Sequence, residues 1–220
     1  MDKKYEMTNE IIMLNGKTLY RIRALVDFDD VKTGDFGGYI EKEENLSHYD
    51  NAWVYGDARV YGDAEVYGNA RVYYNARVYG NARVYDNARV YGNAEVCGNA
   101  IVCGNARVYG NTIVYGNAIV CGDAEVCGNA KVYGDARVYG DAEVCGNADY
   151  TTIKGFGTNF RTTTFFRCKD NFVRVSCGCF YGTIKEFRER VKTTRIGKIA
   201  KEYLMIADLM EYHFDEHSKD

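Results

Sequence analysis

Histidine and cysteine are the residues of this chain whose chemistry could support catalysis or metal binding. The chain has three histidines, His48, His213 and His217, and eight cysteines. Near neutral pH an imidazole is the usual general base for removing a proton from a hydroxyl or an amine. All three histidines lie outside residues 54–144, the regular part of the sequence. We therefore predict that the protein has no catalytic residues of this kind and is not an enzyme.

A group near the C-terminus has part of the spacing of a zinc site. His213 and His217 are four residues apart, which places two imidazoles on one face of a helix, and three cysteines precede them. Structural zinc sites usually have about two to four residues between neighbouring cysteines, but Cys177 and Cys179 are separated by one. Buried thiols and an acidic tail explain the same residues. We predict no metal and no cofactor, and zinc at Cys168, Cys177, Cys179, His213 and His217 stays an alternative.

The elements that must position any functional residue form a repeat of six residues. A valine recurs sixteen times from Val54 to Val144, inside the unit Ala-x-Val-[Tyr/Cys]-Gly-[Asn/Asp]. A period of six cannot keep apolar residues on one face of an α-helix, so the pattern predicts short strands. Val and the Ala two residues before it share the inner side of each strand. The residue between them and the Tyr or Cys after Val point outward. The Gly-[Asn/Asp] pair supplies positive φ at a corner, and three corners close one coil.

This pattern resembles the left-handed parallel β-helix of the hexapeptide-repeat family over residues 46–150. The resemblance implies a mainly β fold, a left-handed parallel solenoid and trimers formed through the coils. Acyltransferases of the family use a histidine on or near the coils, and its carbonic-anhydrase-like members bind zinc through histidines on adjacent coils. The present coils contain no histidine. An atypical acyltransferase, with His48 or a cysteine as base or nucleophile, remains an alternative.

Both ends of the coil need a cover, because a solenoid end exposes unpaired strand edges. We predict an N-terminal β cap over residues 1–45, the β-helix over 46–150, and C-terminal strands with two helices over 151–220. The N-terminal cap contains a hairpin over residues 5–27 that turns at Asn15-Gly16. Ile40 and Leu46 are expected to continue the Ala column. The lead-in at residues 31–47 resembles that of hexapeptide-repeat proteins common in phages and prophages of bacteria.

The repeat ends at Tyr150, and the C-terminal region has ordinary strand and helix signals. Residues 160–168 and 172–180 are predicted strands. Thr183 begins a helix, with Glu186 completing a capping box. A second helix over residues 197–214 has an apolar stripe and is expected to cover the C-terminal coil or to mediate self-association. The stripe consists of Ile199, Tyr203, Ile206, Met210 and Phe214.

Composition narrows the class of protein. A net charge of −3 and an ordinary apolar content exclude a disordered chain and a generally basic nucleic-acid binder. The sequence has no apolar run of membrane-spanning length and no hydrophobic signal core, so we expect a cytoplasmic protein with no membrane contact. Five cysteines replace tyrosine at the outward repeat position and are expected to be reduced thiols. They are Cys97, Cys103, Cys121, Cys127 and Cys145.

Residues eighteen apart stack on adjacent coils at about 4.8 Å, so the outward residues form columns on three faces. Face one is the expected ligand or partner face, because stacked arginines favour an anion and tyrosines can stack on bases or sugars. A nucleotide or a nucleic acid is therefore an alternative partner. Tyrosine also stabilises a sheet, and the stem of an arginine can cover it, which explains the same columns without a ligand. The face-one residues are Trp53, Tyr55, Arg71, Tyr73, Arg89, Tyr91, Arg107 and Tyr109, followed by Glu125 and Glu143.

Face three is the expected oligomer interface. Ile101 and Ile119 occupy outward positions where the other coils have Arg, Lys or Glu, which favours a covered surface over a solvated one. Cys103 and Cys121 extend this patch, and Ile113 adds to it across a corner. Scattered exposed apolar residues are also normal, so sequence drift is the competing explanation. The sequence thus predicts a non-enzymatic binding or scaffold protein, a phage-encoded homotrimer that binds and occludes a host macromolecule, including a protein of a defence system.

Overall fold

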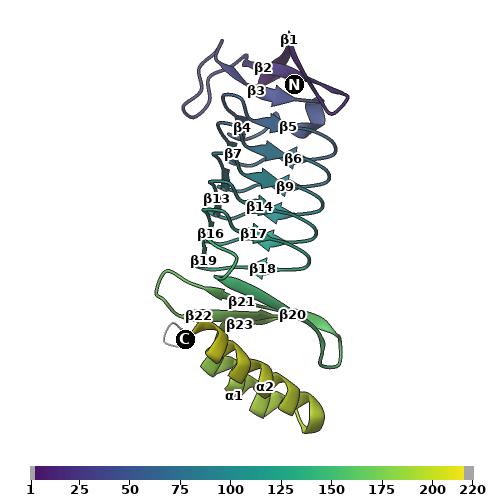
Figure 1. The fold of residues 1–220 in the computed structure, drawn as a ribbon. Coiled ribbons are helices and arrows are strands. Elements are labelled where there is room, and N and C mark those ends of the chain that lie inside the picture. Colours follow the sequence, from purple (N-terminus) through teal and green to yellow (C-terminus); the bar gives the residue numbers. More distant parts are fainter. Residues whose placement is uncertain (1–2, 216–220) are drawn as a thin grey trace.

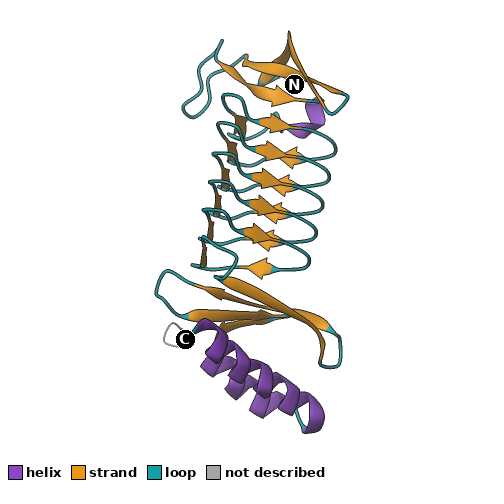
Figure 2. Ribbon diagram, viewed as in Figure 1, coloured by secondary structure: helices purple, strands orange, loops and turns teal. Residues whose placement is uncertain are grey.

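An elongated β-solenoid lies between an N-terminal sheet and a C-terminal region of strands and helices (Figure 1). The computed structural model describes residues 3–215, so His217 lies outside the described part of the chain. Figure 2 shows the coil strands stacked in columns, with loops at the corners and the two long helices at the C-terminal end. The predicted mainly β solenoid with an N-terminal hairpin and a C-terminal α+β region is confirmed.

The elements have the following bounds. The N-terminal elements are β1 (Tyr5–Leu14), β2 (Lys17–Ala24), β3 (Phe36–Ile40) and the 3-10 turn η1 (Glu43–Asn45). The coil strands are β4 (Trp53–Val54), β5 (Arg59–Val60), β6 (Glu65–Val66), β7 (Arg71–Val72), β8 (Arg77–Val78), β9 (Arg83–Val84), β10 (Arg89–Val90), β11 (Glu95–Val96), β12 (Ile101–Val102), β13 (Arg107–Val108), β14 (Ile113–Val114), β15 (Ile119–Val120), β16 (Glu125–Val126), β17 (Lys131–Val132), β18 (Arg137–Val138) and β19 (Glu143–Val144). The C-terminal elements are β20 (Tyr150–Phe156), β21 (Arg161–Arg167), β22 (Val173–Cys177), β23 (Phe180–Thr183), α1 (Ile184–Thr194) and α2 (Gly197–Phe214).

The core of the coil consists of the predicted valine and alanine columns. Every valine from Val54 to Val144 is at most 1% exposed, and the alanines two residues before them are fully buried. Strands three apart in sequence pair in parallel, so β4, β7 and β10 belong to one sheet and β6, β9 and β12 to another. The third sheet contains β5, β8 and β11 and continues into β3, β2 and β1 of the cap. Small aliphatic side chains let three sheets approach closely around one narrow core.

Each corner from Gly56 to Gly140 turns on one residue with positive φ. Gly104 has φ +67°, and the two corners without glycine place Tyr74 at +59° and Asp86 at +58°. We expected both corner positions to adopt positive φ, but the Asn or Asp at the second position does not. A single left-handed residue is enough to redirect the chain, which leaves the second side chain free for another role.

That role is hydrogen bonding between coils. The amide of Asn69 donates to the side-chain oxygen of Asn87 at 3.1 Å, and Asn87 donates to Asn105 at 3.1 Å. Similar ladders run along the other two corners, and one of them ends where Asn117 donates to Asp135 at 3.0 Å. An amide can both donate and accept, so each Asn can join the coils on either side of it.

Thr112 is the exception in the alanine column and gives a test of core packing. Its side chain is fully buried, and its hydroxyl has no hydrogen-bond partner among residues 3–215. Since burying an unsatisfied hydroxyl costs about 1 to 3 kcal/mol, we expect Thr112→Ala to raise the free energy of unfolding by about 1 kcal/mol. Denaturant unfolding measures this change. An unchanged or lower unfolding midpoint in Thr112→Ala would show that the hydroxyl is satisfied in solution.

The N-terminal hairpin forms as predicted. β1 and β2 pair antiparallel, and the turn places Asn15 at φ 51° and Gly16 at 77°, the two positive values that a tight hairpin turn requires. β3 pairs antiparallel with β2 on one side and parallel with β5 on the other. The hairpin is therefore joined to the coil through a continuous sheet.

The register of the lead-in differs from our prediction. Ile40 pairs with Val60, and Leu46 bridges Val66, so both residues continue the valine column and not the alanine column. The reason is a longer corner at residues 47–51, which has two residues more than the corners of the repeat. The larger Ile and Leu side chains thereby occupy the inner position that Val fills elsewhere.

The C-terminal region covers the coil with a sheet. β20, β21, β22 and β23 form a four-stranded antiparallel sheet, in which β20 and β23 were not predicted as separate strands. Phe166 and Cys168 from this sheet belong to the core of the coil. Thr183 and Glu186 form the predicted capping box of α1, and α2 spans the predicted residues.

We expected the second helix to cover the C-terminal coil or to mediate self-association. It does not cover the coil. Tyr203, Ile206 and Met210 pack with Phe165 and Phe187 in a separate core between the sheet and the helices. The sheet lies between α2 and the coil, as Figure 1 shows. Of the helices within residues 3–215, none combines the length and the apolar character that crossing a membrane would require.

Candidate interaction faces

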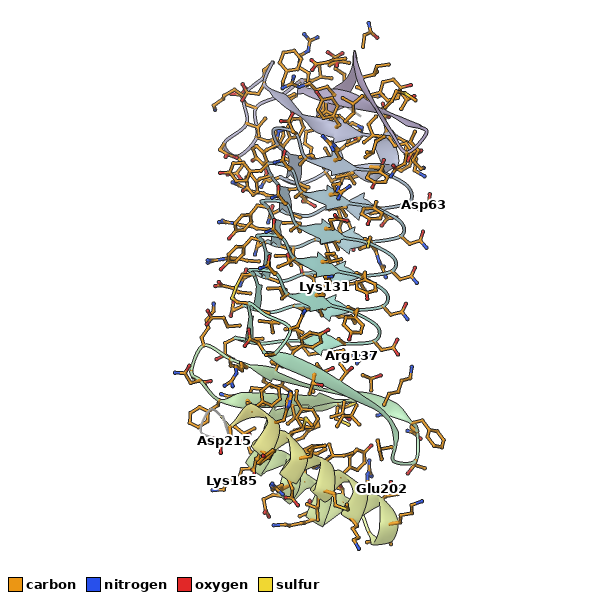
Figure 3. All side chains as sticks on the ribbon, viewed as in Figure 1. Asp63, Lys131, Arg137, Lys185, Glu202 and Asp215 are labelled. Atoms are coloured by element: carbon orange, nitrogen blue, oxygen red, sulfur yellow. A yellow bond between two sulfur atoms is a disulfide. The ribbon has the colours of Figure 1, made fainter. Side chains whose placement is uncertain are left out.

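The outward residues form the three predicted columns. On face one, Arg89 pairs directly with Arg71 on one side and with Arg107 on the other. Face two is the outer side of the sheet that contains β5, β8, β11, β14 and β17, and there Lys131 is exposed. On face three Arg137 is exposed, and both side chains project outward near the C-terminal end of the coil (Figure 3). Parallel pairing with an eighteen-residue offset produces these columns, so the position of each outward residue follows from its number.

The prediction that Trp53 is part of the exposed surface of face one is wrong. Trp53 is 1% exposed, because the N-terminal segment covers it. The ring centroid of Tyr5 is 6.0 Å from that of Trp53, and the centroid of Phe28 is 5.3 Å away. The repeat pattern places Trp53 outward from its strand, but tertiary contacts bury it. Its role is to join the cap to the first coil.

A loop of the N-terminal segment also neutralises the first arginine of face one. Arg71 forms ion pairs with Asp29 and Asp30. The hydroxyl of Tyr55 donates to Asp30 at 2.8 Å. Burial, followed by this hydrogen bond, raises the pKa of Tyr55 well above its usual value. Asp29 and Asp30 lie outside the repeat, so the column pattern contained no signal for them.

At the other end of face one, two cations share one carboxylate. Arg107 lies 3.6 Å from Glu125, and Lys169 of the C-terminal region lies 2.6 Å from the same carboxylate. The hydrogen bond from Lys169 lowers the pKa of Glu125. Among the described residues the guanidinium of Arg89 has no ion pair. The predicted stripe of three free arginines is therefore one arginine without an ion pair between two that contact carboxylates.

The tyrosines of face one form an almost continuous stack. The rings of Tyr55 and Tyr73 are 4.6 Å apart, and those of Tyr91 and Tyr109 are 4.8 Å apart. Tyr73 and Tyr91 meet edge to face at 6.4 Å. All four are half-buried. Rings in these arrangements stabilise one another by about 0.5 to 1.5 kcal/mol per pair, so this column contributes to the stability of the coil whether or not it binds a ligand.

On face three the predicted apolar patch is partly formed. Ile101 and Ile119 are half-buried outward residues that pair on adjacent coils. Cys103 is only 5% exposed, so it contributes little to the surface. Ile113 lies in β14, which belongs to the sheet of face two. The surface residues of the patch are therefore Ile101, Ile119 and the partly exposed Cys121, and Ile113 is across a corner from them.

Four of the five repeat cysteines are paired in disulfides, in contrast to the reduced thiols that we predicted. Cys103 is bonded to Cys121, and Cys127 to Cys145. The Cα atoms of the two pairs are 4.7 and 4.2 Å apart, because residues eighteen apart stack on adjacent coils. Cys97 has tyrosines as neighbours in its column and remains free. Pairing follows from the coil spacing, whereas the prediction rested on the replacement of tyrosine at the outward repeat position and on the expected cytosolic setting.

The disulfides give a second test. Alkylation of the unfolded protein without a reductant is expected to add four labels, at Cys97, Cys168, Cys177 and Cys179, since these are the free cysteines. After reduction it should add eight, the number in the chain. Intact-protein mass spectrometry counts the labels. Eight labels in protein purified anaerobically without a reductant would show that the cysteines are thiols, as the sequence suggested.

His48 is placed poorly for general base catalysis. Its ring stacks on Tyr5 at 4.2 Å, and its Nδ1 accepts a hydrogen bond from the backbone N–H of Lys4 at 3.3 Å. Its Nε2 is buried without a hydrogen-bond partner, 3.8 Å from Glu43. Burial lowers the pKa of His48. One nitrogen already accepts a hydrogen bond and the other is shielded from solvent, so neither is positioned to take a proton from a substrate.

The residues of the alternative zinc site are not brought together. Cys177 of β22 lies opposite Thr163 of β21 in the sheet. Cys168 lies five residues after Thr163 and packs into the coil core. His213 is exposed on α2. Cys168 lies near Asp141 and Asp170, and burial raises its pKa to about 12. This small group already has a cationic partner, since Asp170 forms an ion pair with Arg174 at 2.5 Å.

Comparison with known proteins agrees with this architecture. Four segments of the coil match the model of the YdcK beta solenoid repeat, at residues 76–92, 82–98, 100–116 and 130–146. The chain is a β-solenoid repeat protein. A search of curated proteins found no match. The matched repeats all lie within the coil, so they concern the scaffold and leave both caps unassigned.

Proposed function

We propose that this β-solenoid is a non-enzymatic binding protein that self-associates and presents a rigid surface to a macromolecular partner. The coil supports this proposal because its outward residues have fixed spacing and a backbone that is hydrogen-bonded from coil to coil. A surface that is ordered before binding loses little conformational entropy on contact. The environment of His48 and the absence of histidine from residues 54–144 give no support to an acyltransferase.

The observation that carries the proposal is the pairing of Ile101 with Ile119 on face three. In the same column the neighbouring strands have Arg83 and Arg137, both exposed. The fold therefore accepts a charged residue at this position, and isoleucine is not needed for packing within the coil. Covering the patch with another copy of the chain removes this apolar area from water. The resemblance to hexapeptide-repeat proteins favours a homotrimer.

A double substitution tests self-association. Ile101→Arg with Ile119→Arg introduces the side chain that flanking coils already have, so the variant is expected to fold. Native mass spectrometry and sedimentation velocity should show a trimer for the unmodified protein and a monomer for the variant. Glu65→Arg is the matched control, because it changes a charge in the same column away from the patch, and it should remain a trimer. A monomeric unmodified protein, or a variant that still trimerises, would contradict the proposal.

The biological role that we propose is occlusion of a host protein by a phage-encoded inhibitor in the host cytoplasm. This role rests on the phage-like lead-in sequence, and face one is the proposed contact surface. Its unpaired cation, Arg89, lies beside the column of stacked tyrosines, and Arg and Tyr are enriched at protein contact sites. Arg89→Glu should abolish capture of the host protein while leaving the oligomer unchanged. Unchanged capture would exclude face one.

Nucleic acid is the less favoured partner for face one. The ion pairs of Arg71 and Arg107 leave few unpaired cations for phosphate contacts. Binding through the whole column would show a steep dependence on salt.

A further inference from the structure

A cavity in the C-terminal region lies at one end of the four-stranded sheet, remote from the faces of the coil. It has a volume of about 490 Å³, within the range of about 300 to 1,000 Å³ that small-molecule sites occupy. Three connections meet there: the turn between β20 and β21, the turn between β22 and β23, and the link between α1 and α2. Cys179 from the second connection and Arg195 from the third line the cavity, together with Arg161, the residue that follows the first.

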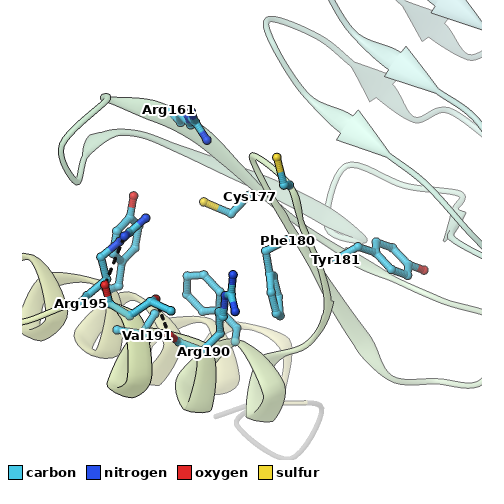
Figure 4. Close-up of a pocket in the computed structure, with 11 residues that line it drawn as sticks. Arg161, Cys177, Phe180, Tyr181, Arg190, Val191 and Arg195 are labelled. Atoms are coloured by element: carbon cyan, nitrogen blue, oxygen red, sulfur yellow. Dashed lines mark hydrogen bonds between the residues drawn. The ribbon is translucent and has the colours of Figure 1, made fainter.

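The charges of this cavity are all positive. Its lining includes Arg161 at the start of β21, Arg190 on α1 and Arg195 at the end of α1, and it includes no carboxylate. Figure 4 shows the Cys177 thiol and the Phe180 ring between the strand that carries Arg161 and the helix that carries Arg190. Three arginines, one at the start of β21 and two on or at the end of α1, thus line one opening.

The arginines of the cavity differ from the other arginines of the C-terminal region, which form ion pairs. Residues 151–215 contain six arginines, and three of them contact carboxylates. These are Arg167, Arg174 and Arg188, which pair with Asp149, Asp170 and Glu211. The three arginines of the cavity have no ion pair with any residue in the described range 3–215. Unpaired guanidinium groups close to one another repel, and an anion between them removes that repulsion.

Apolar and aromatic groups form the rest of the wall. Phe187 and Val191 are buried beneath the opening, and Tyr203 packs edge to face on Phe187 at 5.7 Å. A guanidinium is well suited to a phosphate because it can donate two parallel hydrogen bonds.

We propose that this cavity binds a small phosphorylated molecule with a flat apolar part, of which a nucleoside monophosphate is the simplest representative. The phosphate lies among Arg161, Arg190 and Arg195, and the flat part lies against Phe180 and Tyr203. This site is independent of the coil faces and of the proposed self-association.

Calorimetric titration of the full-length protein with adenosine monophosphate tests the proposal. Arg190→Gln and Arg195→Gln should each weaken binding by about tenfold, the loss expected for one charge-assisted hydrogen bond. Lys192→Gln is the matched control, since it removes the same charge from the same helix at a residue that pairs with Glu189 and does not line the cavity. It should bind as the unmodified protein does. Inorganic phosphate and adenosine alone should each bind more weakly than the monophosphate.

Protection of thiols gives a readout that requires no substitution. Cys177 and Cys179 line the cavity, whereas Cys97 lies on face two of the coil. Bound adenosine monophosphate should slow alkylation of Cys177 and Cys179 and leave Cys97 unchanged. Absence of both binding heat and protection would overturn the proposal, as would equal weakening by all three substitutions.

Discussion

Gly104→Ala is expected to lower the free energy of unfolding by about 3 kcal/mol. Gly104 adopts φ +67°, where a side chain is strained, and a Cβ there would lie 2.8 Å from the backbone nitrogen of Gly122 on the next coil. Backbone atoms of a stacked coil cannot move without disturbing the hydrogen bonds on either side. Strain and crowding therefore add at this position. Chemical denaturation followed by circular dichroism measures the loss.

Gly134 separates the two causes. It has the same φ of +67°, but nothing lies within 4 Å of the position of its Cβ. Gly134→Ala should therefore cost only about 1 kcal/mol, the strain of a left-handed alanine. If both variants lose the same stability, crowding between coils contributes nothing and the corners are looser than the structure indicates.

The protein is expected to lose stability steeply as the pH rises above about 10, where free tyrosine ionises. Burial raises the pKa of many of its tyrosines above that ordinary value. The unfolded chain therefore releases these protons first and binds fewer protons than the folded chain. The stability that these tyrosines contribute is fully present below pH 10 and is lost as the pH rises towards their pKa values in the folded protein. A tenfold difference in proton affinity between the folded and the unfolded chain corresponds to about 1.4 kcal/mol of stability.

Unfolding midpoints across this pH range, together with tyrosinate absorbance, measure the effect. Lys4 changes stability in the opposite direction, because burial lowers its pKa to about 8 and stability rises between pH 8 and 10.5 as the unfolded chain retains its proton. Tyr61→Phe removes one buried group whose pKa is raised by burial, so its loss of stability with pH should be shallower than that of the unmodified protein. Equal slopes in the two proteins would contradict the assignment.

The scaffold could be predicted from the sequence because its rules are local. The six-residue period places Val90 inward and Arg89 outward, and it stacks Arg89 between Arg71 and Arg107. The hairpin turn at Asn15-Gly16 and the capping box of Thr183 are also local patterns, and both form as expected. In each case the deciding interactions join residues close in sequence or residues at a fixed offset.

The candidate sites depended on contacts between segments with no fixed offset. Asp29 and Asp30 reach Arg71 from the N-terminal loop, and Lys169 reaches Glu125 from the C-terminal region, so the charge of face one is set by both caps. Burial of Trp53 by Phe28 has the same origin. No period relates these partners, and their approach depends on how each cap packs on its end of the coil.

The sequence by itself determined the coil, its core and its columns, because each follows from the alternation of strand side chains and from positive φ at one corner residue per hexad. The tertiary structure decided which column residues remain free, and that Arg161, Arg190 and Arg195 line one cavity. Local backbone geometry sets the first group, whereas packing between segments that are distant in the chain sets the second.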